Sequence, residues 1–179
     1  MKKLFKSTPL EDSFGCNFNV LIAGTPRVLG VRELLLEWIA FRTQCVNRRV
    51  YFDLSKAKDK LHLLEGLQKI LLDIDKAIKI IRSTDEEQEV VPNLMIGFGI
   101  DKIQAEYVAE IKLRHLNREY ILKRTADIEQ LRKDIEDMED ILSSKSRVKK
   151  IIIAELKEVA EKYDKPRRTE IIFADVEDD

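Results

Sequence analysis

The sequence predicts a mainly α-helical protein, with a long antiparallel coiled-coil arm, a small helical tip and a small β-sheet at the base. Three observations lead to this class. The chain has 179 residues, 36% of them charged, and only six glycines and four prolines interrupt it. Its long runs are rich in Leu, Ile, Glu, Lys and Arg, the composition of extended helices. Apolar residues recur along these runs in steps of three and four, as in helices that pack along one stripe.

The base is expected in residues 1–45 and contains a β-hairpin. Short strands are predicted around 18–22 and 27–29, because both runs combine apolar and β-branched residues. The letters AGTP between them form a turn, for which Gly24 and Pro26 supply the backbone angles. A two-stranded hairpin is only marginally stable in water, so the sheet needs a further strand.

An outgoing coiled-coil helix is expected over 46–90. Between residues 31 and 82 there is no proline and one glycine, Gly66, which is the position that favours a bend. Some fifty helical residues would extend for roughly 75 Å, far longer than a helix of a globular domain. The apolar stripe of this segment comprises Val46, Val50, Leu54, Ala57, Leu61, Leu64, Leu67, Leu71, Ile74, Ile78 and Ile81.

Residues 91–117 are expected to form the small tip at the far end of the arm. Asp101 and Gln104 have the spacing of a capping box, in which each side chain bonds the backbone of the other, so a helix is predicted to begin there. The letters GFG at 97–99 lack the strand, the third glycine and the lysine of a nucleotide-binding loop. They are interpreted as a chain reversal with Phe98 packed or presented at the surface.

The returning coiled-coil helices are expected over 118–163. A heptad seam follows the first part, the letters SSKS at 143–146 break it, and Ser146 is predicted to cap the helix that continues to Tyr163. Beyond it, a β-branched run at 169–173 is predicted to return as the further strand of the base sheet.

Composition and spacing favour a cytoplasmic protein without a metal site. The lysines near the start are not followed by the apolar core of a signal peptide, and no window reaches the roughly 18 apolar residues that span a bilayer. Cys16 and Cys45 form no CxxC pair, so reduced thiols are expected.

Four polar residues resemble metal ligands but have ordinary interpretations. Asp73 and Asp75 have DxD spacing, yet residues two apart on a helix point to nearly opposite sides. His62 and His115 lie in helical runs without a Cys or carboxylate at ligand spacing, so packing or surface roles are expected. No metal ligand and no catalytic residue is therefore predicted.

Charge is distributed unevenly along the chain. Residues 1–60 carry eleven Lys and Arg against six Asp and Glu, a net charge of +5, and residues 61–179 carry twenty-one against twenty-seven, a net charge of −6. A polyanion would therefore bind to the first third of the chain. Its basic segment, NRRVYFDLSKAKDK at 47–60, could contact phosphates or simply form a salt-bridged helix.

Four stretches of the sequence, taken in order, carry a family resemblance: LFKSTPLEDSFGCNFNVLIAGTPRVL, RTQCVNRRVYFDLSKAKDKLHLLEGL, IDKIQAEYVAEIKLRHL and EKYDKPRRTEI. Their order and spacing resemble the A subunit of bacterial type IIA topoisomerases, the family of DNA gyrase and topoisomerase IV. The resemblance covers essentially the whole chain. It implies that 1–45 is part of the tower domain that flanks the cleaved duplex, and that 164–179 is a return strand to the tower with an acidic tail.

The resemblance also implies which residues carry function. The tip would dimerise as the exit gate for the transported DNA duplex. The candidate interface residues are Ile96, Phe98, Ile103, Tyr107 and Ile111, which would be divided between the tip's own core and the interface. Arg48 and Arg49 would lie beside DNA at the tower end, and the charge of the basic segment adds Lys58 as a third residue that would bind DNA weakly. The expected partners are a second copy of the chain, duplex DNA and the topoisomerase B subunit, without a membrane.

The same resemblance implies that the chain cannot cleave DNA alone, although it would be part of an ATP-hydrolysing isomerase. The family's nucleophile is a tyrosine directly preceded by arginine, which bonds covalently to the DNA 5′ phosphate. None of the tyrosines here follows an arginine: they are Tyr51, Tyr107, Tyr120 and Tyr163. Magnesium and ATP are used by the partner subunit, so no cofactor is expected in this chain. The alternative function is a stand-alone coiled-coil adaptor or chaperone-like arm that binds a protein partner through its tip.

Overall fold

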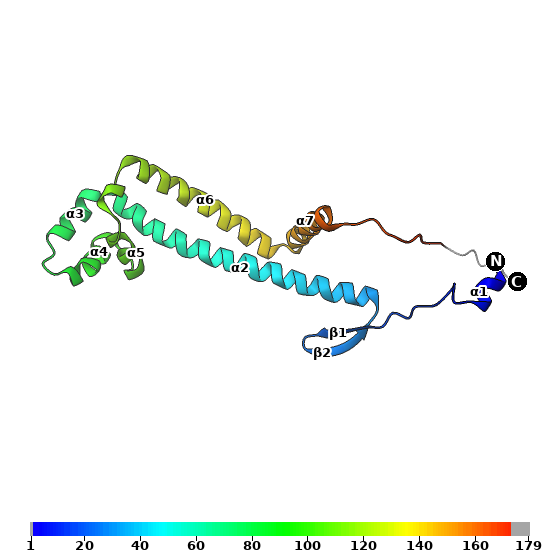
Figure 1. Cartoon of the computed structure of the whole chain (residues 1–179). Coiled ribbons are helices and arrows are strands. Elements are labelled where there is room, and N and C mark those ends of the chain that lie inside the picture. The colour runs from blue at the N-terminus through cyan, green and yellow to red at the C-terminus, as the bar shows by residue number, and fades with distance from the viewer. Residues whose placement is uncertain (1, 173–179) are drawn as a thin grey trace. The chain divides into compact units, whose positions relative to one another are not determined.

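The computed structural model describes residues 2–172 and is mainly helical (Figure 1). It divides into two compact units, Met1–Cys45 and Val46–Asp179. The longest helix, α2 (Val31–Leu72), passes through the boundary between the units. The predicted class, a helical protein with a long arm and a small sheet, is confirmed.

The first unit contains a short helix, α1 (Lys2–Ser7), and one hairpin. Strands β1 (Phe18–Ile22) and β2 (Thr25–Leu29) pair antiparallel, with Ile22 opposite Thr25. The two residues between them, Ala23 and Gly24, have positive φ angles of 49° and 80°. This left-handed pair is the turn that matches the twist of two short strands. The loop is thus shorter than predicted, and Pro26 lies in β2 rather than in the turn.

The predicted further strand of the sheet is wrong over the described part of its range. The sheet has two strands, β1 and β2, and residues 169–172 are not in a strand, while residue 173 lies outside the described residues. A β-branched run favours an extended chain, but it becomes a strand only where a sheet edge accepts its backbone groups. Local propensity is therefore insufficient to predict a strand at this position.

In the second unit, α2 pairs antiparallel with α6 (Arg118–Ser143) and α7 (Lys145–Tyr163). The direction follows from the cross-helix ion pairs: Glu65 meets Arg132, Lys58 meets Glu139 and Arg49 meets Glu155. In these three pairs, a lower residue number in α2 goes with a higher residue number in the returning helices, so the helices run in opposite directions. Figure 1 shows α6 lying along α2, with α7 continuing beyond a break.

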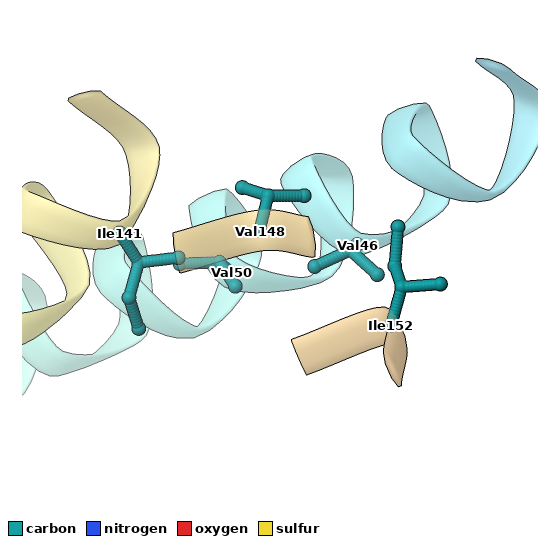
Figure 2. Packing of buried hydrophobic residues seen from close by; sticks show 5 residues of the cluster. All are labelled: Val46, Val50, Ile141, Val148 and Ile152. Carbon is teal, nitrogen blue, oxygen red and sulfur yellow. The ribbon is translucent and has the colours of Figure 1, made fainter. Parts of the chain in front are cut away.

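Two apolar clusters hold this arm together. The first contains Val46 and Val50 of α2, Ile141 of α6, and Val148 and Ile152 of α7, and Figure 2 shows these side chains directed into the space between the three helices. The second contains Leu64 and Leu67 of α2 with Ile128 of α6. The predicted apolar stripes therefore face each other, as their periodicity indicates.

The break between α6 and α7 lies at Ser144, whose side chain accepts a hydrogen bond from the backbone N–H of Arg147. The predicted cap, Ser146, is wrong, because this residue is already inside the first turn of α7. The Arg147 guanidinium lies 2.8 Å from Asp137 Oδ1 and 2.7 Å from Asp140 Oδ2. These two carboxylates raise the pKa of Arg147, chiefly through hydrogen bonds, and they join the two helices across the break.

The bend in the outgoing helix also lies elsewhere than predicted. Helix α2 continues through Gly66 and ends at Leu72, and α3 (Ile74–Arg82) begins after Asp73. The Asp73 side chain accepts from the backbone N–H of Lys76 and caps α3. Gly66 instead provides room for Gln104: a Cβ at Gly66 would lie 2.6 Å from the Gln104 Cβ.

The tip consists of α3, a short 3₁₀ turn η1 (Glu87–Glu89), α4 (Val90–Phe98), α5 (Lys102–Ala109) and a second turn η2 (Leu113–His115), gathered at the end of the α2–α6 pair (Figure 1). The capping box of Asp101 and Gln104 at the start of α5 is confirmed. Gly99 ends α4 with a φ of 60°, which glycine adopts easily. The chain reversal predicted at 97–99 is therefore a helix C-terminus.

Candidate functional site

The structure separates the five predicted interface residues into two groups. Ile96 and Ile103 are 84% and 64% exposed. Phe98 packs against the tip core, which is formed by the buried residues Ile70, Ala77, Leu94, Ile100 and Ala105. Tyr107 and Ile111 pack against the cluster of Leu64, Leu67 and Ile128 at the end of the arm. Two residues are thus available for intermolecular contact, and three stabilise the tip itself.

Two lysines hold the end of α4 in place. Lys76 Nζ donates to the Gly97 carbonyl at 2.7 Å, and Lys69 Nζ donates to the Gly99 carbonyl at 3.2 Å. The last carbonyls of a helix lack partners within it, and they carry partial negative charge that favours cations. Lys76 Nζ also lies 4.9 Å from the centre of the Phe98 ring. These contacts attach the end of α4 to α2, through Lys69, and to α3, through Lys76.

A polar group that the sequence analysis missed attaches the tip to α2. His62 Nε2 is paired with Asp101 Oδ2, the carboxylate that caps α5. Gln104 is 7% exposed, and its Nε2 donates to the His62 carbonyl at 2.7 Å. The sequence predicts only a packing or surface role for His62, because Asp101 lies 39 residues further along the chain. The capping box can be recognised in the sequence, but it does not indicate that the Asp101 side chain also pairs with His62.

This arrangement lowers the pKa of the Asp101 carboxyl below its ordinary value of 3.8. The backbone N–H of Gln104 contributes most, burial opposes the change, and the hydrogen bond and charge of His62 add to the lowering. A carboxyl with a lowered pKa in the folded state stabilises that state above the unfolded pKa. The contribution is lost as the pH falls through the lowered folded value.

We expect the attachment of α5 to weaken with acidification below pH 3.8, and less so in Asp101→Asn. Asparagine still caps a helix, but it carries no charge for His62 and does not titrate. Hydrogen exchange of α5 amides measured from neutral pH down through this range checks the difference. An identical pH dependence in the two proteins would show that the Asp101 charge does not hold the tip.

A second polar cluster lies where the tip meets α6. The rings of His115 and Tyr120 stack with centroids 5.4 Å apart, and the Arg124 guanidinium lies 4.8 Å from the Tyr120 ring centre. Arg124 Nη1 is 2.8 Å from Asp127 Oδ2. Burial raises the pKa of the Tyr107 hydroxyl, and so does Tyr120, while Arg124 opposes the change. The group holds η2 and α5 against the returning helix.

Two of the three predicted DNA-binding residues form ion pairs with the returning helices. Arg49 is 2.5 Å from Glu155 of α7, and Lys58 is 2.6 Å from Glu139 of α6. Both basic side chains are about half exposed, so each pair contributes roughly 0–1 kcal/mol to stability. Arg48 is exposed. Arg49 and Lys58 therefore join neighbouring helices. This is the salt-bridged helix that the sequence analysis gives as the alternative to phosphate contact.

The described residues offer neither a metal site nor a membrane span. Residues 2–172 contain no group of three or more His, Cys, Asp or Glu side chains placed to hold a metal ion. Asp73 caps α3 while Asp75 lies in its first turn, so they are not two positions of one helix as predicted, yet they still form no such group. Nor do the helices in this range include one with the length and apolarity needed to cross a bilayer.

Comparison with known proteins gives the family of the chain. A family model that describes the A subunit of DNA gyrase/topoisomerase IV matches residues 1–157. The A subunit of DNA topoisomerase 4 from Salmonella typhimurium is 39% identical over 94% of this chain, and that of DNA gyrase from Leptospira biflexa is 36% identical over 99%. The chain spans only 22% and 21% of the lengths of these two relatives. It therefore belongs to the family of DNA gyrase and topoisomerase IV A subunits.

Proposed function

We propose that this segment forms the dimeric exit gate of a type IIA topoisomerase, through which a transported DNA duplex leaves the enzyme. The observation that supports it is the exposure of Ile96 and Ile103 on a tip whose own core is already closed. Leu94 and Ala105 are fully buried and Ile100 is 6% exposed, without help from the two exposed isoleucines. In this proposal the two isoleucines form part of an apolar contact surface between two tips.

In this proposal, two tips meet across a two-fold axis, so that the same residues of each chain contact one another. Closing the gate buries the exposed isoleucines of both tips, and opening exposes them again. Because only a small apolar surface is involved, the contact is weak enough to break during each passage. The arm, stiffened by its apolar clusters, would carry the movement of the tip as a rigid-body displacement.

In this proposal, strand cleavage and ATP hydrolysis are carried out by other parts of the enzyme. Strand cleavage requires a tyrosine nucleophile that none of the four tyrosines of this chain matches, so the segment would not cut DNA alone. Magnesium and ATP would be bound by the partner B subunit in the cytoplasm. Among the described residues there is no group of three or more His, Cys, Asp or Glu side chains placed to hold a metal ion.

Self-association through the tip is the first test. Ile96→Asp and Ile103→Asp are each expected to convert a dimer into a monomer at tens of micromolar, because a charge would be buried without a partner. Leu122→Asp is the control, since Leu122 is 61% exposed on α6, outside the tip. Size-exclusion chromatography with light scattering measures the mass. A monomeric unmodified chain at this concentration would contradict the proposal and favour an adaptor arm.

DNA contact by the basic segment is a separate test. The double change Arg48→Glu and Arg49→Glu is expected to weaken duplex binding by roughly tenfold and to lower the salt dependence by about two phosphate contacts. Lys123→Glu with Lys133→Glu is the control, because it changes the net charge equally on α6. Fluorescence anisotropy of a labelled duplex at several salt concentrations measures both quantities. If both double variants lost the same affinity for the duplex, the effect would come from net charge and not from contacts by Arg48 and Arg49.

A further inference from the structure

One face of α2 receives the connection between α4 and α5, which runs from Gly99 to Asp101. The residues of this face, here called the α2 stripe, are His62, Gly66 and Lys69, whose spacing of four and three places them on one side of the helix. Lys69 Nζ donates to the Gly99 carbonyl at 3.2 Å. His62 Nε2 is paired with Asp101 Oδ2. Both ends of the connection are therefore attached to α2, through residues on either side of Gly66.

Between these two contacts, Gly66 allows α5 to approach α2 closely. A Cβ at Gly66 would lie 2.6 Å from the Cβ and 2.8 Å from the Cγ of Gln104. Gln104 Nε2 donates to the His62 carbonyl at 2.7 Å and lies 3.4 Å from His62 Nδ1. A neutral His62 ring that carries its proton on Nε2 can accept from Gln104 and donate to Asp101 at once. The stripe thus combines a close approach of two helices with directed polar contacts.

The two exposed isoleucines flank the connection that the stripe holds. Ile96 lies three residues before Gly99, in the last turn of α4. Ile103 lies between Asp101 and Gln104, in the first turn of α5. Their side chains are 84% and 64% exposed, so packing contributes little to their orientation. Where they point is therefore set by the backbone on the two sides of the connection.

We propose that the α2 stripe positions Ile96 and Ile103 for the contact between two tips, and so passes a displacement of α2 directly to the gate. The inference rests on the proposed function, because it assumes a two-fold contact through these isoleucines. Such a contact meets the same displacement twice, once in each chain. A small shift of the connection therefore weakens the contact at both of its halves. The stripe residues are positioning residues, which act on the second tip only through the isoleucines.

Sedimentation equilibrium of the full chain measures the dissociation constant of the dimer in matched variants. Gly66→Ala, which pushes α5 away from α2, is expected to weaken dimerisation by about tenfold. Glu65→Ala is the control, since it introduces the same residue at the neighbouring position, where the carboxylate contacts Arg132 of α6 at 2.9 Å. His62→Leu is expected to weaken dimerisation by about threefold, through the loss of one half-exposed pair in each chain. His62→Gln is expected to restore it, because its amide can donate to Asp101.

Hydrogen exchange of the same proteins separates positioning from unfolding of the tip. The Leu94 amide is expected to keep its protection in His62→Leu. The Asp101 and Gln104 amides, which bond to each other's side chains, are expected to exchange faster in that variant and not in His62→Gln. Lost protection at Leu94 would reduce the effect to unfolding and overturn the proposal.

The outcomes distinguish this proposal from the gate itself. If Gly66→Ala and His62→Leu dimerise as tightly as the unmodified chain, the positioning is overturned and the gate stands. If the unmodified chain is monomeric, the gate fails, and the exchange of the Asp101 and Gln104 amides decides the positioning. Unchanged exchange of these two amides in His62→Leu would then overturn it as well.

Discussion

Replacing Leu94 by alanine is expected to destabilise the tip by about 2–5 kcal/mol. Leu94 is completely buried, and it lies in the cluster that joins the end of α2 to α3, α4 and α5. Alanine would leave a cavity that these short helices can only partly close. Hydrogen exchange of amides in α4 and α5 measures the change as a free energy of local opening. The amides in the middle of the arm, whose apolar contacts lie in other clusters, are expected to change little.

Leu122→Ala is the matched control for this prediction. Leu122 has the same side chain in a helix of the same unit, but it is 61% exposed. Its truncation is expected to change stability by less than about 0.5 kcal/mol. Equal effects of the two substitutions on the tip amides would mean that the tip has no packed core. The contrast between the exposed Ile96 and a closed core, on which the proposed gate rests, would then be lost.

The helical arm can be predicted because its physical cause is local and repetitive. Every turn of the stripe from Val46 onward repeats the same apolar spacing, and every turn of the returning helices repeats its counterpart. An error at one position leaves the rest of such a pattern intact. The capping box at Asp101 is predictable for the same reason, since both of its members lie within four residues.

The errors lie where the structure depends on contacts between distant segments or on a choice among similar residues. Gly66 favours a bend by residue type, but its missing side chain makes room for Gln104, 38 residues away, and the helix breaks at Asp73 instead. Either Ser144 or Ser146 is a suitable cap by residue type, and in the structure Ser144 caps α7.

The candidate interface shows the same limit. Isoleucine, phenylalanine and tyrosine residues in the tip have similar apolar character, so the sequence does not separate those that stabilise the tip from those that face outward. The structure separates them by burial: Ile96 and Ile103 are exposed, while Phe98 is packed. The role of His62 is missed because the pair that it forms with Asp101 depends on α5 lying against α2, a contact that no local pattern encodes.

Gly66→Ala is expected to destabilise the attachment of the tip to the arm by about 1–3 kcal/mol. In an ordinary helix this substitution would stabilise by about 1 kcal/mol, because alanine is the better helix former. Here the added Cβ would lie 2.6 Å from the Cβ and 2.8 Å from the Cγ of Gln104. These atoms are close to the α5 backbone, so relieving the clash requires α5 to move away from α2. Such a movement would also separate Gln104 from the His62 carbonyl.

Gly97→Ala provides the control, because it is also a glycine with an atom close to its added Cβ. The near atom there is Cδ1, the end of the flexible Ile80 side chain, which can rotate aside. Gly97 lies inside α4, so the gain in helix propensity is expected to offset the small rearrangement and leave stability within about 1 kcal/mol of the original. Urea denaturation followed by circular dichroism, with hydrogen exchange of α5, measures both variants. A gain in stability for Gly66→Ala would mean that Gln104 does not pack on α2. It would also contradict the attachment of the tip through Gln104 and His62.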